Sequence, residues 1–392
     1  MTPGEEARPE PGPVLVELVA LGVVLTVRFT GCAGHEIDDF VLAWQRCGAR
    51  RCETRQAGSI VIDAVVWAAG NAGHEAGEPA GTVPPAAERL AAGSFRELSH
   101  HLSGLITRSA IGARRGELLM LHAGAVSSRE TGGVIAFIGP SGRGKTTAST
   151  ALGRHFGYVT DETVAIADGL AVIAYPKPLS VKLPEPEPWK SQVAPGELGL
   201  IEPGEPPLRL VGLVMLDRRP SGSAAVARVA LAEAVEELVP QISFLAERRR
   251  ALQHLGSVVD ACGGLHSVTY SEAVDLPAVF AELFEQASGR AALAEQPVGP
   301  HDARARYRSI VDDALPDGSS LIVLQGGTVS VLAGIAPVLV TEAAGTGRFF
   351  GELVEAVRAA HGEPPAGDAV EAVANAIDEL VGAGLLERSD AL

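Results

Sequence analysis

Residues 139–146 read Gly-Pro-Ser-Gly-Arg-Gly-Lys-Thr, and this stretch decides the fold expected for the chain. The apolar run 134–138 precedes it, and the helix-like segment 147–152 follows it. A buried strand aims such a loop, and its glycines free backbone N–H groups to wrap a phosphate at the N-terminus of the next helix. The spacing predicts a nucleotide-binding α/β domain, and the alternative is a glycine-rich strand-to-helix turn that binds no nucleotide.

Two side chains of this loop carry its expected chemistry. Lys145 is predicted to reach the β- and γ-phosphates, and the Thr146 hydroxyl is predicted to bind Mg²⁺. The expected cofactors are therefore a purine nucleoside triphosphate, taken as ATP, and Mg²⁺. The residues predicted to bind the nucleotide are Gly139, Pro140, Ser141, Gly142, Arg143, Gly144, Lys145, Thr146 and Thr147.

The composition is typical of a soluble chain with several domains. Of 392 residues, 46% are hydrophobic and only 4% are aromatic, so two or three cores of Ala, Val and Leu are expected. No run of about eighteen apolar residues occurs, and the Pro- and Glu-rich start does not resemble a signal peptide, which predicts no membrane partner. Four cysteines without metal-ligand spacing fit a cytoplasmic location. A net charge of −16 disfavours nucleic acid as a partner.

Changes in composition divide the chain into five predicted segments. Glycine, proline and small polar residues mark the boundaries. The segments are a disordered tail (1–13), an accessory α+β region (14–105), the nucleotide domain (106–285), a linker (286–302) and a carboxy-terminal domain (303–392).

Periodicity predicts the main elements within these segments. Expected strands cover 14–19, 23–29 and 60–66, and expected helices cover 36–45 and 95–113. The Pro-rich stretch 184–207 is expected to be irregular, and one long helix is expected over 231–255. In the carboxy-terminal domain, the sequence predicts a hairpin of strands 321–324 and 328–332, followed by helices near 334–343, 349–360 and 368–383.

Two acids lie at a turn after the helix that follows the phosphate loop. Phosphoryl transfer needs an acid near the metal and a group that orients the attacking hydroxyl, and Asp161 and Glu162 are placed for both tasks. The alternative is an exposed turn at a strand end. Asp217, which ends the apolar run 211–216, is a lower-ranked candidate for a metal-binding acid.

Residues 118–280 resemble the HPr-kinase-like branch of P-loop proteins. The resemblance rests on His122 in the segment 121–126, on the loop 139–147, and on Thr-Asp-Glu-Thr-Val at 160–164. In that family a His precedes the loop at a similar distance and an Asp-Asp pair follows it. The resemblance implies an HPr-kinase/PEP-carboxykinase-like fold, with Asp161 as general base and His122 polarising the site.

The second acid departs from the family pattern. The resemblance implies that Glu162 binds the metal, with Asp161 beside it, but Glu is one methylene longer than the family's Asp. The division of roles between the two therefore stays open. The Arg- and Gly-rich signature associated with phosphorylase activity has no counterpart here, so the family's role in carbohydrate regulation is not implied. Kinase-like members also occur in peptide-tailoring pathways.

Residues 305–388 resemble a PqqD-type, winged-helix-like peptide-recognition domain, through the hairpin and the three helices after it. The resemblance implies that the leader of a ribosomal precursor peptide adds as a strand beside the last hairpin strand, against the third helix. A winged helix can also bind DNA, but residues 301–392 hold six arginines, no lysine and fourteen acids, which argues against it. The residues predicted to bind peptide are Val329, Ser330, Val331, Leu332, Val373 and Ile377.

Together these patterns predict an ATP-dependent kinase. Its expected acceptor is a Ser or Thr hydroxyl on a ribosomal precursor peptide held by its own carboxy-terminal domain. Two alternatives remain: a nucleotide-switched peptide chaperone or ATPase without transfer, and a kinase for a small metabolite. The sequence leaves the peptide, the acceptor position and the formation of a homo-oligomer open.

Overall fold

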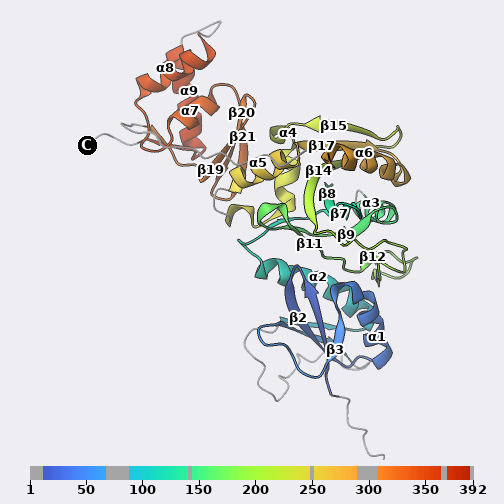
Figure 1. The fold of residues 1–392 in the computed structure, drawn as a ribbon. Coiled ribbons are helices and arrows are strands. Elements are labelled where there is room, and N and C mark those ends of the chain that lie inside the picture. The colour runs from blue at the N-terminus through green and yellow to red at the C-terminus, as the bar shows by residue number, and fades with distance from the viewer. Residues whose placement is uncertain are drawn as a thin grey trace, which may run out of the picture. The chain divides into compact units, whose positions relative to one another are not determined.

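The computed structural model describes residues 12–67, 88–139, 144–247, 251–288, 307–362 and 369–388, which form a mixed α/β protein with several sheets (Figure 1). The chain divides into two compact units. Unit 1 comprises Met1–Phe137, Ser141–Leu210 and Glu272–Pro277, and unit 2 comprises Ile138–Pro140, Val211–Ser271 and Ala278–Leu392. Within the described ranges, no helix combines the length and apolarity needed to cross a membrane.

Unit 1 begins with a five-stranded sheet in the order β3-β1-β2-β4-β5. Its strands are β1 (Val14–Ala20), β2 (Val23–Thr30), β3 (Arg50–Cys52), β4 (Ile60–Val66) and β5 (Glu88–Ala92). The first two predicted strands are present, and Leu21 and Gly22, both with positive φ, join β1 to β2 as an antiparallel hairpin. Val16 and Leu18 are fully buried in the core on this sheet, and Glu17 between them is also buried.

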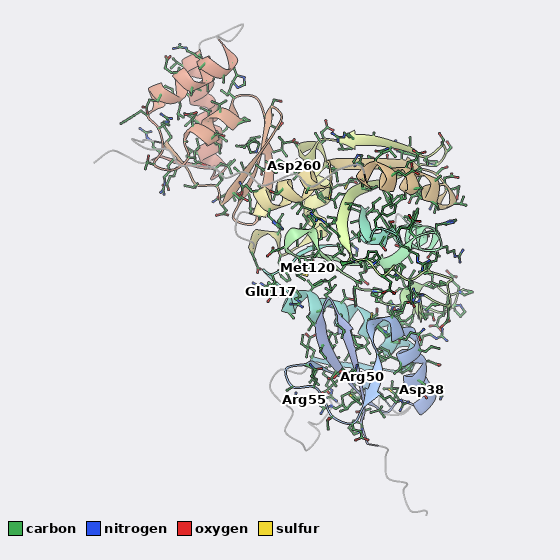
Figure 2. All side chains as sticks on the ribbon, viewed as in Figure 1. Asp38, Arg50, Arg55, Glu117, Met120 and Asp260 are labelled. Carbon is green, nitrogen blue, oxygen red and sulfur yellow. The ribbon has the colours of Figure 1, made fainter. Side chains whose placement is uncertain are left out.

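Helices α1 (Gly34–Ala43) and α2 (Phe95–Ala113) contribute to the core on this sheet. Ser94 starts α2, since its hydroxyl accepts a hydrogen bond from Glu97 N at 3.2 Å, and the helix has the predicted bounds. The same core includes Met120, labelled in Figure 2, and other residues from later strands. The accessory sheet and the strands after α2 therefore share one core, and the predicted boundary at 105/106 falls inside α2.

The rest of unit 1 carries the strands around the phosphate loop. These are β6 (Leu119–Leu121), β7 (Gly124–Ser127), β8 (Gly133–Ile138), β9 (Gly157–Thr160), β10 (Val164–Ile166), β11 (Val172–Ile173), β12 (Leu179–Val181) and β13 (Ser191–Val193), with helix α3 (Lys145–Gly153). Strand β7 pairs antiparallel with both β8 and β9, and β10 pairs with β6 and β11. A Cβ at Gly124 would overlap the Phe137 ring, so only glycine allows this close packing.

The prediction that 184–207 is wholly irregular was wrong at one place. Residues Ser191–Val193 form β13, which pairs with β12 in register, Leu179 opposite Val193. Prolines mark the segment as a loop, yet backbone pairing needs only three residues with free N–H groups, and Ser-Gln-Val provides them.

Unit 2 contains a parallel strand pair with helices. Its first elements are β14 (Arg209–Arg218), β15 (Ala225–Val229), α4 (Leu231–Leu238), β16 (Ile242–Ser243), α5 (Ala251–Ala261), β17 (Leu265–Tyr270) and α6 (Leu276–Ser288). Strand β17 pairs parallel with β14 and antiparallel with β15. The single helix predicted over 231–255 was wrong: Pro240 lies in a 3₁₀ turn after α4, and its missing N–H and ring end the α-helix there. Helix α6 also extends into the predicted linker, whose residues 289–302 lie outside the described ranges.

The last part of unit 2 has the predicted hairpin and three helices. It comprises β18 (Tyr307–Ser309), β19 (Asp313–Asp317), β20 (Ser320–Gln325), β21 (Thr328–Leu332), α7 (Ala336–Glu342), α8 (Phe350–His361), α9 (Ala369–Gly382) and β22 (Leu386–Arg388). The sequence analysis missed β19, which adds a third strand in the order β19-β20-β21, and the β18–β22 pair. In this sheet β21 is an edge strand.

Strand β19 joins this part to the helices before it. Oδ2 of Asp313 accepts a hydrogen bond from Leu252 N, in the first turn of α5, at 2.5 Å. At the other end of β19, Oδ2 of Asp317 accepts from Ala232 N of α4 at 2.6 Å. Between them, a Cβ at Gly256 would lie 2.8 Å from Leu315 Cδ1, so strand and helix are closely packed. Two carboxylates from one strand thus cap two helices.

Candidate functional site

The elements on both sides of the phosphate loop match the predicted strand–loop–helix. Strand β8 ends at Ile138 and α3 begins at Lys145. Gly144, the N-cap of α3, has φ +94°, a conformation that side-chain-bearing residues rarely adopt. Residues Pro140, Ser141, Gly142 and Arg143 lie outside the described ranges, so their predicted contacts with nucleotide remain predictions. The described flanks place Lys145 and Thr146 in the first turn of a helix, where backbone N–H groups favour an anion.

The predicted acid pair lies in the turn between β9 and β10. Thr160 Oγ1 accepts hydrogen bonds from Glu162 N at 3.2 Å and Thr163 N at 3.3 Å, which fixes the turn. The side chain of Asp161 is only 5% exposed and that of Glu162 is 32% exposed. The alternative of a freely exposed turn therefore does not hold for Asp161.

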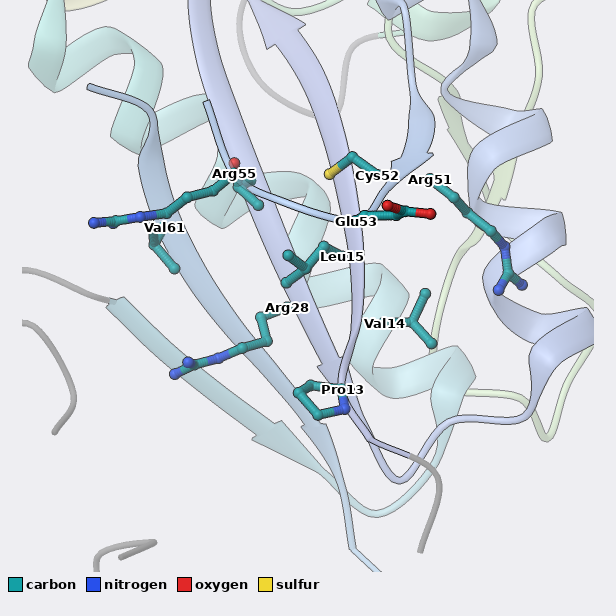
Figure 3. Close-up of a pocket in the computed structure, with 10 residues that line it drawn as sticks. Pro13, Val14, Leu15, Arg28, Arg51, Cys52, Glu53, Arg55 and Val61 are labelled. Carbon is teal, nitrogen blue, oxygen red and sulfur yellow. The ribbon is translucent and has the colours of Figure 1, made fainter. Parts of the chain in front are cut away.

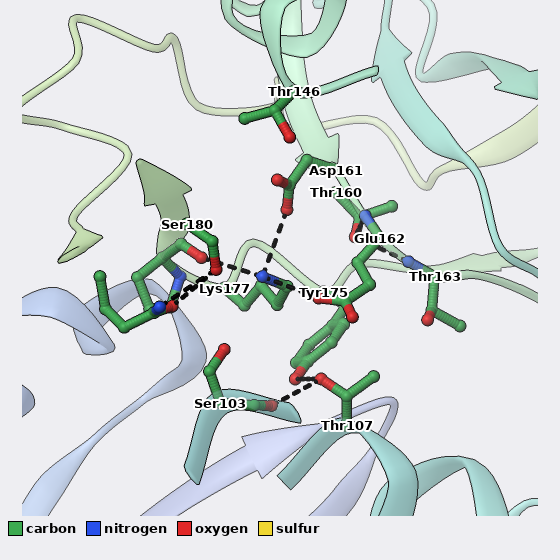
Figure 4. Close-up of polar contacts among 12 residues, drawn as sticks. Ser103, Thr107, Thr146, Thr160, Asp161, Glu162, Thr163, Tyr175, Lys177 and Ser180 are labelled. Atoms are coloured by element: carbon green, nitrogen blue, oxygen red, sulfur yellow. Dashed lines mark hydrogen bonds and ion pairs between the residues drawn. The ribbon is translucent and has the colours of Figure 1, made fainter. Parts of the chain in front are cut away.

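Lys177 is the residue whose place the sequence analysis did not predict. The Lys177 side chain is 1% exposed, so it is not a solvated surface charge. Its Nζ lies 2.8 Å from Glu162 Oε2 and 3.5 Å from Asp161 Oδ1 (Figure 4). It also donates a hydrogen bond to Pro178 O at 3.1 Å. The only sequence signal was its setting, between Pro176 and Pro178 and two residues after a tyrosine.

One oxygen of Asp161 is held from two sides. The Tyr158 hydroxyl lies 3.2 Å from Asp161 Oδ1, the oxygen that also faces Lys177. Figure 4 shows Thr146 on the opposite side of the Asp161 carboxyl from Lys177. Oδ2 of Asp161 makes no hydrogen bond among the residues that the structure describes, so it is the oxygen left for a ligand.

Helix α2 contacts the segment that carries Lys177 through Thr107 and Tyr175. The Tyr175 hydroxyl lies 2.9 Å from Thr107 Oγ1, and Thr107 in turn donates to Ser103 O at 2.9 Å. The Tyr175 ring also lies 6.4 Å from the Trp44 ring, centroid to centroid. Because Tyr175 is two residues before Lys177, these contacts anchor the segment that carries the buried ammonium.

His122 lies near the acid pair, and its predicted role stays a prediction. It follows β6, and the next residue, Ala123, donates its N–H to Glu162 O at 3.1 Å. Burial lowers the pKa of His122 and the nearby Lys145 charge lowers it further, while Glu162 opposes the shift through its carboxylate and a backbone hydrogen bond. His122 is therefore neutral near pH 7.

Charge and burial act in opposite directions across the cluster. Burial raises the pKa of Asp161, and the Lys177 charge reduces this shift. Burial acts the same way on Glu162, but the Lys177 ammonium, together with smaller contributions from His122 and Lys190, outweighs it and the net pKa is lowered. For Lys177, burial alone would lower the pKa, yet the two carboxylates raise it above its usual value. Lys145 has its pKa lowered by burial, against the pull of Glu162 and Asp161. Lys177 is thus charged, and the carboxylates of Asp161 and Glu162 balance its charge.

Other predicted positions lie elsewhere. Asp217 is in β14, where its Oδ2 accepts a hydrogen bond from Arg219 Nε at 2.6 Å, so its charge already has a partner. Its metal role stays a prediction. Val373 and Ile377 of α9 are 0% and 1% exposed within the core of the carboxy-terminal helices. As described they are packing residues, and a peptide would have to displace neighbours to reach them.

A hollow of about 1030 Å³ lies on the accessory sheet, and none of its lining residues is a predicted site residue (Figure 3). Its lining residues include Arg28, Arg51 and Arg55. Asp63 binds Arg28 through two hydrogen bonds of 2.6 and 2.7 Å, and Arg51 pairs with Asp38. Two of the three cations are therefore already compensated, and this hollow is not the candidate site.

Comparisons with known proteins add little to this geometry. No family model matches the chain, and no curated protein matches it. Among solved structures, the HPr(Ser) kinase/phosphatase from Coxiella burnetii is similar at a TM-score of 0.22 and 10% identity, over 43% of this chain and 94% of that chain. A likeness this weak carries no argument, so the functional proposal depends on the residues.

Proposed function

We propose that this protein is an ATP-dependent phosphotransferase that phosphorylates a Ser or Thr hydroxyl of a ribosomal precursor peptide. One observation carries the proposal. The buried Asp161 keeps Oδ2 free on the side of Thr146, in a cluster with Lys145 and His122. A carboxylate with a raised pKa beside a phosphate-binding helix start is what a hydroxyl nucleophile needs.

The residues divide the work of the transfer. Lys145 and the first turn of α3 bind the β- and γ-phosphates. Asp161 Oδ2 accepts the proton of the acceptor hydroxyl. At the same time, the hydroxyl oxygen of the Ser or Thr forms a bond to the γ-phosphorus. The bond from that phosphorus to the β,γ-bridging oxygen breaks, and ADP leaves. Neutral His122 can donate a hydrogen bond toward the transferred group without adding repulsion to Lys145.

The donor set suits Mg²⁺ brought in with the nucleotide. Across the described ranges, no group of three or more His, Cys, Asp or Glu side chains is arranged to hold a metal ion by itself. Mg²⁺ usually keeps several waters and binds through few protein oxygens plus substrate phosphates, so the Thr146 hydroxyl beside carboxylates fits it. Held there, Mg²⁺ would neutralise charge on the phosphates.

The open edge of β21 supports a peptide as the acceptor. Gly326 and Gly327 both have positive φ, which is typical of a two-residue type I′ turn. In such a hairpin the flanking pair, Gln325 and Thr328, is hydrogen-bonded, and hydrogen-bonded pairs then alternate along the ladder. The N–H groups of Val329 and Val331 therefore point away from β20. An extended leader peptide can pair with them as an added strand.

Mass spectrometry tests the proposal directly. The full chain is incubated with ATP, Mg²⁺ and the peptide encoded by a short open reading frame beside its gene. We expect the peptide to gain one phosphate, and Lys145→Ala to reduce transfer by orders of magnitude because the phosphates lose their fixed cation. The control is Lys182→Ala, which removes an exposed lysine outside the cluster and should leave transfer intact.

Other outcomes contradict the proposal in distinct ways. ATP hydrolysis with an unmodified peptide would favour a nucleotide-switched chaperone or ATPase. Phosphorylation of a small metabolite alone would favour a metabolite kinase. Equal turnover by Lys145→Ala and the parent protein would exclude this loop as the catalytic one.

A further inference from the structure

Lys177 is an ammonium group buried between two carboxylates of the candidate site. Its side chain is 1% exposed, and it is among the largest side chains that the structure buries completely. Three oxygens surround Nζ: Glu162 Oε2 at 2.8 Å, Pro178 O at 3.1 Å and Asp161 Oδ1 at 3.5 Å. The ammonium therefore donates to one backbone carbonyl and forms an ion pair with each of the two carboxylates.

The segment around Lys177 limits its movement. Pro176 and Pro178 flank it and restrict the backbone. The Tyr175 hydroxyl contacts Thr107, and the Lys177 carbonyl lies 3.3 Å from the Tyr158 hydroxyl. Backbone and neighbours are therefore anchored to α2 and β9. The ammonium is a fixed part of the site and not a surface charge that swings in and out.

A divalent cation shared by the two carboxylates would need the space that Nζ occupies. Two cations a few ångströms apart in a buried site repel strongly. Mg²⁺ and Mn²⁺ also require oxygen ligands, and Lys177 already binds the facing oxygens of Asp161 and Glu162. The Lys177 ammonium thus already balances the charge of the Asp161–Glu162 pair, and no metal ion is needed for it.

We propose that Lys177 is the resident cation of the Asp161–Glu162 pair and excludes a divalent metal from between them. Glu162 is then the partner of Lys177 and not a metal ligand. Lys177 is a positioning residue, since it holds Oδ1 of Asp161 and turns Oδ2 toward the Thr146 side. This last consequence depends on the proposed phosphotransfer, whereas the exclusion of metal does not.

Metal binding to the nucleotide-free chain tests the proposal without ATP or peptide. The probe is Mn²⁺ alone, followed by electron paramagnetic resonance and calorimetry. Lys177→Met keeps an unbranched side chain only one atom shorter but removes the charge, which leaves two adjacent carboxylates. We expect this variant to gain one Mn²⁺ site at least tenfold tighter than any in the parent chain, and the double variant Lys177→Met/Glu162→Gln to lose it. Lys182→Met is the matched control and should gain no site.

A second comparison keeps the test decisive if Lys177→Met does not fold. In the otherwise unchanged chain, Glu162→Gln should leave Mn²⁺ affinity unaltered, because Glu162 is bound to Lys177 and not to metal. Weaker Mn²⁺ binding in Glu162→Gln would overturn the proposal. A folded Lys177→Met that gains no site would overturn it too. A failure to phosphorylate peptide changes neither result, so it would count against the proposed function only.

Discussion

Asp161 and Glu162 are neighbours in sequence, yet the structure gives them unequal surroundings. Asp161 is nearly enclosed, with one oxygen held by Lys177 and Tyr158 and the other directed to the Thr146 side. Glu162 is partly exposed and uses its carboxylate to neutralise Lys177 at 2.8 Å. The environment, more than residue type, therefore distinguishes a candidate base from a charge partner.

Replacement of each acid should separate these two roles. Asp161→Asn removes the proton acceptor, so we expect transfer to fall by about 10²- to 10⁴-fold while Mg·ATP binding persists. Glu162→Gln keeps the Asp161 carboxylate and should leave more activity. Calorimetry for nucleotide binding and an ADP-release assay with peptide provide the two measurements. Loss of Mg·ATP binding in Asp161→Asn, with binding retained in Glu162→Gln, would assign Asp161 to the metal instead.

At the scale of elements, sequence patterns predicted helices and strands best where residues adjacent in sequence determine the backbone geometry. The hairpin across Gly326-Gly327 and helix α2 after Ser94 were predicted, because a positive-φ turn and an N-cap act over a few residues. The helix expected over 231–255 failed at Pro240. Its apolar spacing belongs to two helices, α4 and α5, that pack as separate elements.

Proline substitutions in β21 should locate the peptide edge. Because Val331 N–H points away from β20, Val331→Pro removes an outward donor without breaking the hairpin ladder. We expect it to weaken binding of a labelled leader peptide to the full chain by about tenfold, the loss of one main-chain hydrogen bond plus steric hindrance. Fluorescence anisotropy measures the affinity.

Two variants control this experiment. Val331→Ala keeps the N–H and should bind nearly as well as the parent chain. Ser330→Pro removes an N–H that faces Val323 in the ladder, so it should lower the melting temperature of the chain. Unchanged leader binding by a folded Val331→Pro would show that the peptide does not add to this edge.

At the scale of the whole molecule, side-chain contacts as well as the covalent chain connect the carboxy-terminal sheet to the helices α4 and α5 of the same unit. Asp313 and Asp317 cap α5 and α4, and Leu315 packs against Gly256. At the opposite edge of this sheet, β21 pairs with no further strand among the residues that the structure describes. Such an edge strand keeps a row of unpaired backbone N–H and C=O groups.

Removal of a cap should weaken this attachment. Asp313→Ala deprives Leu252 N of its acceptor, so we expect a loss of about 1 kcal/mol in the free energy of unfolding, as for other helix caps. Denaturant unfolding of the full chain measures it. The control is Asp260→Ala, an exposed acid near the end of the same helix that makes no such contact. Equal stability of the two variants would contradict a capping role for Asp313.

Short-range patterns in the sequence predict the strand before the loop and the helix at Lys145, the β21 hairpin and the adjacency of Asp161 and Glu162. Each depends on residues that are close along the chain, where turns, caps and periodicity act. The burial of Lys177 between the two acids, and the cap that Asp313 gives a helix 61 positions earlier, arise from tertiary packing and have no short-range signal. Such contacts form when packed elements bring distant residues together, and burial then makes an ion pair out of charges that would be solvated in the unfolded chain.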